Sequence, residues 1–432
     1  MYIRNMKKIF GNIKFWTGVV VLFAAMSKAF AVDPTATKYS FEDCQGSAIP
    51  YPSRTVKELA YPDSLTPVFI NHVGRHGARF LSSSKYTTSL LRVLTKADSL
   101  RTITPEGREL MKLCHTIVAK TAGRWGALDS LGMAEQRAIA SRAFMTFRPL
   151  FDNTKINAIS SYVPRCIMSM DEFTHQLSRL NNKVEIYTSS GRQNSPLVRP
   201  WDSDNDYKSF ISSEEWHNVY ENFVSSHVPE SVAIKALGKA YPFDGDEAKD
   251  ISLNIYKVVS GCAAMAINVN LKKYFNEEEI NALWSVENLH HYLTHAASTL
   301  STVPAEMASQ LLVNLISTMN DAVDGKNEYS VMLRFGHAET LMPLLSLMHL
   351  PGCYYMTNYF DTVGLHWRDF YVVPMAANLQ LILFRADSGK YYVRTDLNET
   401  PVPLIPGRTT LYTPWEAARE YLTRCLPLHM QI

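Results

Sequence analysis

Residues 67–80 join a short apolar stretch to a turn made of arginine, histidine and glycine. The stretch Pro67–His72 has the pattern of a buried strand, which we expect to end at Gly74. After the turn, Tyr86, Leu90, Leu91 and Leu94 recur at helical spacing. A strand that leads through a turn into a helix is the repeating unit of α/β folds, so this segment favours that class.

The turn itself carries side chains suited to phosphate chemistry. Arg75 and Arg79 flank His76 in the run Arg75-His76-Gly77-Ala78-Arg79. A guanidinium group stays positively charged at physiological pH and donates two parallel hydrogen bonds to a phosphate. A histidine between two such groups offers a nucleophilic nitrogen where the anion would bind. We therefore expect this turn to take a phosphoryl group from an ester.

The strand–helix alternation continues along the chain. Ile156–Ser160 and Ser330–Phe335 are further predicted strands, and a helix over Thr340–Met348 follows the second of them. Leu379–Phe384 and Tyr391–Thr395 predict a hairpin at a sheet edge. The alternation predicts an α/β fold with a mainly parallel sheet and helices on both faces.

A helical region interrupts this pattern, and Asn276 with Glu279 three residues later predicts the start of one of its helices. We expect an α/β core over residues 32–206 and 300–432, with an inserted, smaller α-helical domain over 207–299. A cleft between the two parts, beside the carboxyl ends of the strands, is the expected binding site.

The first residues predict export. Lysines precede an apolar run over Phe15–Met26, and Ala29-Phe30-Ala31 fits a cleavage site of the small-x-small type. We therefore expect residues 1–31 to be a signal peptide and the mature protein to be periplasmic or secreted, without a membrane span. The six cysteines can then oxidise, but their fifteen possible pairings stay open, as does the oligomeric state.

The net charge and the positions of the motifs favour a small anionic substrate over a nucleic acid. The formal net charge of +2 gives no reason to expect nucleic-acid binding, so a small anionic substrate must be held by a local cluster of positive charge. Each of three predicted strands is followed by suitable side chains, namely Arg75, His76 and Arg79, then Arg165, then His337 and Glu339. If the strands are neighbours, these groups converge beside a helix N-terminus.

Other polar groups have ordinary interpretations. His290, His291 and His295 lack the glutamate of a zinc-protease helix and are expected to be partly buried helix residues. The acidic run Asp202, Asp204 and Asp206 lacks the pattern of a calcium loop and is expected to be a solvated turn. Four cations could bind outer phosphates but are expected to be solvated surface charges, namely Lys85, Lys183, Arg192 and Arg199.

The run Arg75–Arg79, together with His337-Ala338-Glu339, resembles the signature of the histidine acid phosphatase branch of the histidine phosphatase superfamily. The three-residue distal motif is most similar to that of the multiple inositol polyphosphate phosphatases, which hydrolyse phytate. Further segments that resemble this family are Leu128 with Gly132 and Gln136, Arg165 with Ser169, and Val393–Leu404. Leu81 stands where the family often has proline, which puts only the loop shape and substrate preference in question.

The resemblance implies a role for each site residue. His76 would be the nucleophile and become a phosphohistidine, and Glu339 would protonate the leaving alkoxide and then activate water. Substrate phosphate would be bound by Arg75, Arg79, Arg165 and His337, without a metal or other cofactor. The resemblance also implies an α/β domain with a smaller α domain.

Two alternatives stay open at the level of sequence. The first is a general acid phosphatase that acts on sugar phosphates or other small monoesters. The second, less favoured, is a non-catalytic anion-binding protein, because mere binding needs neither the nucleophile His76 nor the acid Glu339.

Overall fold

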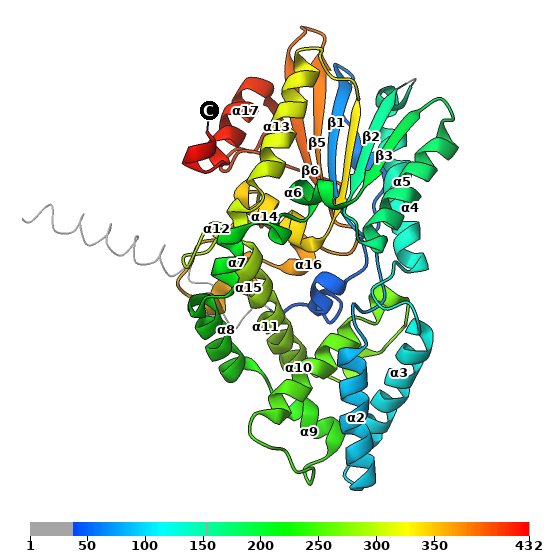
Figure 1. Cartoon of the computed structure of the whole chain (residues 1–432), viewed down its shortest axis with the longest axis vertical. Helices are drawn as coiled ribbons and strands as arrows, with labels where there is room; N and C mark the ends of the chain where they lie inside the picture. Colours follow the sequence, from blue (N-terminus) through cyan, green and yellow to red (C-terminus); the bar gives the residue numbers. More distant parts are fainter. Residues whose placement is uncertain (1–37, 153, 432) are drawn as a thin grey trace, which may run out of the picture. The chain divides into compact units, whose positions relative to one another are not determined.

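In the computed structural model, which describes residues 38–152 and 154–431, strands form one mixed sheet of eight (Figure 1). The predicted signal peptide lies outside the described residues. The order across the sheet is β3-β2-β4-β1-β5-β6-β7, and β8 pairs with β6. The strands are β1 Leu65–Arg75, β2 Lys155–Ser160, β3 Glu185–Ser190, β4 Val331–Gly336, β5 Asn378–Ala386, β6 Tyr391–Leu397, β7 Thr400–Val402 and β8 Tyr412–Pro414.

The sheet combines a parallel and an antiparallel half. Strands β3, β2, β4 and β1 are parallel, whereas β5 runs antiparallel to β1 and continues into the hairpin with β6. The predicted strands and the pairing of the hairpin are confirmed, but its predicted place at a sheet edge is wrong, since β5 lies between β1 and β6, and β6 also pairs with β7 and β8. Arg75 pairs with Gly336 across β1 and β4, and Ser160 of β2 pairs with Phe335. The carboxyl ends of the three motif-bearing strands therefore lie at one edge of the sheet.

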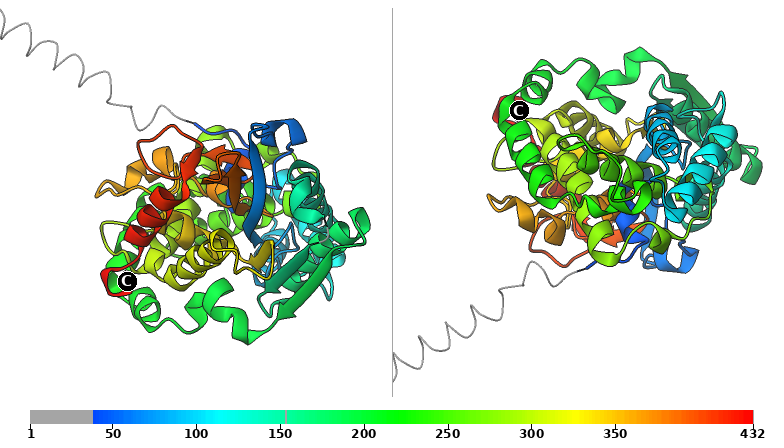
Figure 2. Two further views of the ribbon diagram at one scale, coloured as in Figure 1. Left: turned by 90° about the horizontal axis from the view of Figure 1, so that it is seen from above. Right: turned by 90° about the horizontal axis from the view of Figure 1, so that it is seen from below.

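Helices cover both faces of the sheet, as the sequence predicts. Along β5, Leu379, Leu381 and Leu383 belong to one apolar core, and Ile382 and Phe384 belong to the other. This alternation follows from the two-residue period of a strand that is buried on both faces. One layer contains α4 (Ser130–Thr146) and α5 (Pro164–Leu180), and the other α13 (Ser309–Val323), α14 (Ala338–Leu347) and α17 (Trp415–Cys425) (Figure 2).

A second group of helices lies beyond the sheet edge that carries the motifs (Figure 1). It contains α8 (Glu214–His227), α9 (Ser231–Leu237), α10 (Glu247–Ser260) and α11 (Glu277–His295), and residues 207–299 include no strand among the described residues. Helices α2 (Lys85–Ser99) and α3 (Pro105–Thr121) precede the predicted insertion, yet they pack against α10 and α9. The domain boundaries given above stay a prediction.

Shorter helices complete the chain. The α-helical ones are α6 Ser195–Val198, α7 Asn205–Ile211, α12 Val303–Glu306, α15 Val363–His366 and α16 Asp369–Val372. The 3-10 helices are Asp43–Ala48, Val56–Leu59, Arg148–Phe151, Arg192–Asn194, Pro200–Asp202, Ala263–Met265, Leu271–Lys273, Phe360–Thr362 and Leu428–Met430. Among the helices of the described residues, none has the length and apolar character needed to span a bilayer. All six cysteines are free thiols in the described part of the chain.

Local capping explains two helix starts. In α11 the side chain of Asn276 accepts a hydrogen bond from the backbone of Glu279, and the Glu279 carboxylate accepts one from the backbone of Asn276, each at 2.8 Å. This reciprocal pair confirms the predicted start. Helix α14 starts at Ala338, two residues earlier than predicted, because the Thr340 hydroxyl accepts a hydrogen bond from the backbone N–H of His337 at 2.9 Å.

The turn after β1 lies directly against α4. A Cβ atom on Gly132 would lie 2.2 Å from the carbonyl oxygen of Ala78, and a Cβ atom on Gly77 would lie 2.4 Å from the carbonyl oxygen of Gly132. Both distances are far below van der Waals contact with backbone atoms that cannot move independently. The helix and the turn can approach this closely only because both positions are glycine.

Replacement of Gly132 should therefore force the helix and the turn apart. We expect Gly132→Ala to lower the free energy of unfolding by about 1–3 kcal/mol, the usual cost of overpacking. Urea denaturation followed by circular dichroism measures this change. Ala134→Ser adds an atom on the exposed side of the same helix and should change stability by less than about 0.5 kcal/mol. Equal stability of Gly132→Ala and wild type would contradict the close approach.

Candidate active site

The turn after β1 is held in place by backbone and side-chain hydrogen bonds from three parts of the chain. The N–H of His76 donates to the carbonyl of Gly336 at 3.1 Å, and the His76 carbonyl accepts from Ala376 at 3.1 Å. Gln136 of α4 donates to the carbonyl of Arg75 at 3.0 Å. These bonds tie the turn to β4, to the segment before β5 and to α4, so its side chains have fixed directions.

Two further side chains hold the backbone N–H groups of the turn. Glu135 accepts from the N–H of Ala78 at 2.7 Å, and the Ser169 hydroxyl accepts from the N–H of Gly77 at 3.1 Å. The same hydroxyl donates to the carbonyl of Arg165 at 2.8 Å. Helices α4 and α5 therefore both position the turn, and the sequence pattern of Arg165 with Ser169 has a structural reason.

The imidazole of His76 is buried and neutral. Its Nδ1 lies 2.9 Å from the carbonyl oxygen of Gly77, which can only accept a hydrogen bond. Nδ1 therefore carries the proton, and Nε2 carries the free lone pair. Burial lowers the pKa of His76 well below its usual range, and the positive charges of Arg75, Arg165 and Arg79 lower it further. The ring thus retains a nucleophilic nitrogen at neutral and acidic pH.

Guanidinium groups surround this ring. Arg75 donates from Nη1 to the carbonyls of Ser47 and Val373, at 2.6 and 2.5 Å, and Arg79 donates to the carbonyl of Phe80 at 2.9 Å. Burial lowers the pKa of Arg75 to about 10 and that of Arg79 to about 9, so both groups stay charged at neutral pH. Among the described residues, the buried Nε atoms of Arg75, Arg79 and Arg165 have no hydrogen-bond partner. Unsatisfied buried cationic donors favour binding of an anion.

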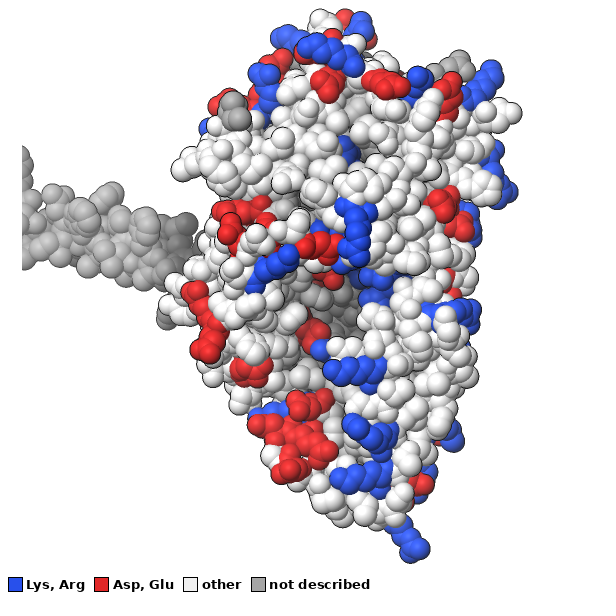
Figure 3. All heavy atoms as spheres, in the orientation of Figure 1, with Lys and Arg blue, Asp and Glu red and all other residues white. Residues whose placement is uncertain are grey.

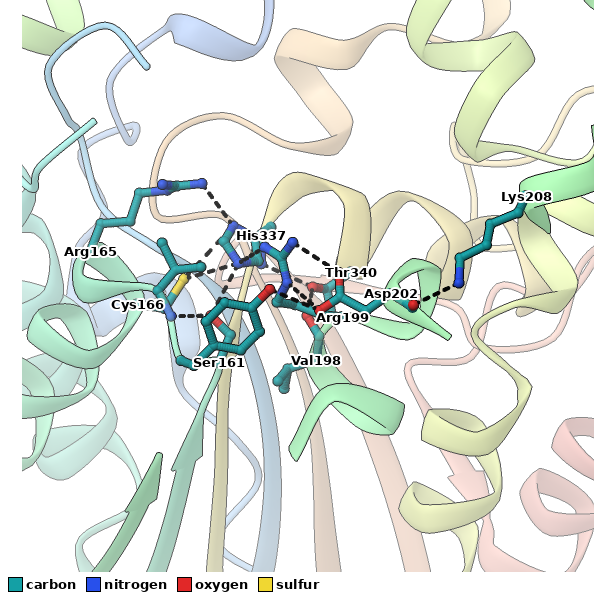
Figure 4. Close-up of polar contacts among 11 residues, drawn as sticks. Ser161, Arg165, Cys166, Val198, Arg199, Asp202, Lys208, His337 and Thr340 are labelled. Carbon is teal, nitrogen blue, oxygen red and sulfur yellow. Dashed lines mark hydrogen bonds and ion pairs between the residues drawn. The ribbon is translucent and has the colours of Figure 1, made fainter. Parts of the chain in front are cut away.

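His337 joins the cluster from the start of α14 (Figure 4). Its ring centroid lies 5.7 Å from that of His76. Arg165 lies 3.2 Å from its Nδ1, and Arg199 and Ser161 lie 3.2 and 3.1 Å from its Nε2. Burial is the main cause that lowers the pKa of His337 to about 3. A neutral imidazole has one acceptor nitrogen, so it can accept from only one guanidinium group and leaves the other for an anion.

Glu339, the second residue of α14, is partly exposed and lines a cavity with Arg79. Burial raises the pKa of its carboxyl group, but the imidazoles of His337 and His295, a backbone N–H group and the Arg75 guanidinium group outweigh this effect and lower the pKa to about 2. The carboxyl group is therefore ionised above acidic pH unless a bound anion offsets these interactions.

The cavity has a volume of about 580 Å³ and extends from Arg79 and Glu339 to the helical wall of α10 and α11. Residues of that wall include Lys257, Glu287 and His291. The space-filling view shows the molecule hollowed at mid-height, with lysine and arginine gathered along one rim and acidic residues on the other (Figure 3). A cavity at the sheet edge beside the helices agrees with the expected position of the cleft.

The structure brings together every site residue that the sequence predicts. His76, Arg75, Arg79, Arg165, His337 and Glu339 share one cluster of electrostatic contacts. Lys85, Lys183 and Arg192 are exposed, as expected. The helix histidines are also as expected, since His291 pairs with Asp369 and His295 contacts Tyr207. No cluster suited to a metal occurs within the described residues.

The expectation of a solvated surface charge is wrong for Arg199. Its side chain is only 17% exposed, forms an ion pair with Asp202 at 3.0 Å and reaches the His337 ring. The predicted solvated turn is likewise wrong at Asp202, which also accepts a hydrogen bond from Tyr162 at 3.0 Å. The contacts of Arg199 with His337 and of Asp202 with Tyr162 were not predicted, because no local sequence pattern links the residues of either pair. The aromatic ring of Trp201 beside Arg199 was the available signal.

Comparison with known proteins finds relatives of this chain by sequence. The chain is 22% identical over 380 residues to multiple inositol polyphosphate phosphatase 1 of Gallus gallus, a match that covers 82% of this chain and 80% of that protein. It is 31% identical over 125 residues to the Homo sapiens protein of the same name, covering 26% of this chain and 25% of that protein.

Solved structures share the fold. The multiple inositol polyphosphate phosphatase of Bifidobacterium longum, in complex with inositol hexasulfate, has a TM-score of 0.75 at 18% identity, covering 90% of this chain and 99% of that one. The phytase from D. castellii has a TM-score of 0.68 at 17% identity, covering 92% and 88%. The family model described as "Histidine phosphatase superfamily (branch 2)" matches residues 68–398. Since this match spans well over half of the sequence, the chain belongs to branch 2 of the histidine phosphatase superfamily.

Proposed function

We propose that this protein is a phosphomonoesterase that hydrolyses phytate and other inositol polyphosphates through a phosphohistidine intermediate. One observation carries the proposal: a neutral His76, with its Nε2 lone pair free, lies among three guanidinium groups. The names of its relatives support the substrate class, since three are multiple inositol polyphosphate phosphatases and one is a phytase. The large cavity also suits an alcohol that carries several phosphates.

In the first step, Nε2 of His76 attacks phosphorus, and the bond between phosphorus and the ester oxygen breaks. The leaving alkoxide takes a proton from the Glu339 carboxyl group and departs as an alcohol. Glu339 must therefore hold a proton when the ester is bound. Substrate phosphates oppose the cations that lower the pKa of Glu339, so substrate binding itself raises that pKa.

In the second step, water attacks the phosphorus of the phosphohistidine. The Glu339 carboxylate takes the proton of that water, the bond between phosphorus and Nε2 breaks, and inorganic phosphate leaves. Arg75, Arg79 and Arg165 stabilise the charge on the phosphoryl oxygens in both steps. His337, held by Ser161, contributes its ring beside the same oxygens. The free N–H groups at the start of α14 add positive potential at the same place.

A general acid phosphatase that acts on sugar phosphates is the second candidate, because the catalytic groups would serve any small monoester. Release of inorganic phosphate from phytate and from a sugar phosphate, compared at equal enzyme concentration, separates the two candidates. A much higher kcat/KM for the sugar phosphate would favour the general phosphatase. Saturable binding of phytate without phosphate release would favour an anion-binding protein.

Two further parts of the proposal concern organisation. We propose that residues 1–31 are a signal peptide that exports the protein to the periplasm or outside the cell. We also propose that residues 207–299 are an inserted α-helical domain, which supplies the helical wall of the cavity. The lysines at the N-terminus and the short apolar run after them support the first proposal. The helices of residues 207–299, with no strand between them among the described residues, support the second.

Removal of the nucleophile should abolish turnover. We expect His76→Ala to lower kcat at least about 10⁴-fold, because the variant lacks the Nε2 atom that attacks phosphorus. Acid-quenched wild type should carry phosphate that is labile in acid and stable in base. His115→Ala, an exposed position on α3, is the matched control and should keep full activity. Substantial turnover by His76→Ala would exclude the assignment.

Glu339 should matter most for poor leaving groups. An inositol alkoxide needs a proton as it leaves, whereas nitrophenolate is stable as an anion, so the two differ in their need for an acid. We expect Glu339→Gln to slow phosphoenzyme formation from phytate by about 10²–10⁴-fold and from p-nitrophenyl phosphate only mildly. Rapid-quench measurement of the initial burst isolates this step.

Glu135→Gln is the control for a carboxyl group that only supports the turn. Its oxygens accept from the backbone of Tyr51 and Ala78, so its loss should affect both substrates equally. Equal slowing of both bursts by Glu339→Gln would show that the proton comes from another group.

Activity should not depend on a divalent metal. Guanidinium groups and a helix terminus supply the positive charge that a metal would otherwise provide. Prolonged dialysis against a chelator should leave kcat/KM for phytate unchanged after the chelator is removed. A loss that zinc or magnesium restores would contradict this prediction.

A further inference from the structure

The cavity that contains Glu339 also contains an ion pair that the proposed mechanism does not use. Nδ1 of His291, on α11, lies 2.9 Å from Oδ2 of Asp369, the first residue of α16 (Figure 1). Asp369 is 2% exposed and His291 is 24% exposed. Both residues line the same cavity as Glu339, so the exposed part of the imidazole belongs to the cavity wall.

Asp369 is fixed from several sides. Its Oδ1 accepts a hydrogen bond from Nε1 of Trp284 at 3.0 Å, and its Oδ2 accepts from the backbone of Ser47 at 3.1 Å. The backbone N–H of Asp369 donates to Asn288 at 2.8 Å. A carboxylate held in this way cannot rotate freely, and it therefore also fixes the ring of His291.

The geometry leaves one donor of His291 available. Nδ1 donates to Asp369, and no group in the described part of the chain bonds to Nε2. Burial lowers the pKa of His291, but Asp369, then Glu287 and Glu339, raise it above its usual value. The ring is therefore protonated at mildly acidic pH and presents an N–H donor with positive charge.

The charges around His291 are otherwise balanced. Glu287 is paired with Lys257 at 2.9 Å. On the same helix, burial lowers the pKa of His290 to about 4 and that of His295 to about 3, so both are neutral above these values. Among the described residues that influence the pKa of the His291 ring, Glu339 is the one other carboxylate. His291 is thus a cation of this part of the wall whose Nε2 donor is unused.

We infer that His291 is a second anion-binding residue of the cavity, which binds a phosphate group other than the one that His76 attacks. The inference rests on the proposed function for the identity of that anion. The cavity of about 580 Å³ is lined by Arg79 and Glu339 of the catalytic cluster and by His291 of the helical wall. Asp369 is the positioning residue of this site, since it orients and charges His291 while its own side chain is only 2% exposed.

This assignment gives a physical basis for preference among substrates. A charge-assisted hydrogen bond to a second phosphate stabilises a polyphosphorylated alcohol in the cavity. A monoester without a second phosphate gains nothing from it. His291 therefore contributes to binding of polyphosphates and leaves the chemistry at His76 unchanged.

The test replaces His291 with glutamine, which keeps a hydrogen-bond donor and removes the charge. KM is measured for phytate and for p-nitrophenyl phosphate, and inhibition constants are measured for inositol hexasulfate and inorganic phosphate against hydrolysis of the latter substrate. We expect His291→Gln to raise the KM for phytate and the inhibition constant of hexasulfate about tenfold. The KM for p-nitrophenyl phosphate and the inhibition constant of inorganic phosphate should change less than about twofold.

Two more variants separate a specific role from a structural one. His290→Gln removes the neighbouring imidazole, which is neutral and packs between Trp216 and Tyr220, and should not change the preference for polyanions. Asp369→Asn removes the charge that raises the pKa of His291. The cationic form is present below that pKa and lost above it, so affinity for hexasulfate should disappear at lower pH than in wild type.

The outcomes distinguish the inference from the proposed function. An unchanged hexasulfate constant in His291→Gln, or an equal loss for p-nitrophenyl phosphate, overturns the inference. Failure of the wild type to hydrolyse phytate overturns the proposed substrate, while a selective loss of hexasulfate binding would still support the second anion site. A shifted pH profile in Asp369→Asn, with thermal unfolding measured in parallel, supports the positioning role.

Discussion

The positive charge concentrated around His76 is the feature on which the hydrogen bonding and the protonation of the site depend. Three guanidinium groups meet at one end of the sheet, and burial of such groups costs free energy unless oxygen atoms surround them. Arg75 is buried between the carbonyls of Ser47 and Val373, which belong to segments far apart in the chain. The fold thus uses backbone dipoles to hold the charge and leaves part of it unsatisfied for a bound anion.

The same charge sets the protonation of the reacting groups. It keeps His76 neutral, which preserves the lone pair that a nucleophile needs, and through Arg75 it adds to the effect of His337 and His295, which lower the pKa of Glu339. A phosphorylated substrate brings negative charge that opposes these cations. In the proposed mechanism, substrate binding thus raises the pKa of Glu339 before the carboxyl group acts as an acid.

Cations outside the pocket are arranged differently. Lys257 pairs with Glu287, and His291 pairs with Asp369. An unpaired guanidinium group attracts an anion strongly, whereas a paired cation has a fixed position and a weaker net field. The pocket around His76 thus suits the transferred phosphoryl group, and the paired cations of the wall suit weaker, position-dependent contacts with the rest of a substrate.

The sequence by itself determined the strand–turn–helix units and the residues at their ends, because apolar periodicity, glycine turns and helix caps are local. It also predicted that Arg75, Arg165 and His337 meet at one sheet edge if their strands are neighbours, and the structure shows these strands to be adjacent and parallel. Only the tertiary structure decided the strand order, the antiparallel β5 and the contacts of Arg199 with His337 and of His291 with Asp369. Those pairs lie 138 and 78 residues apart, and contacts over such separations depend on packing that leaves no local pattern.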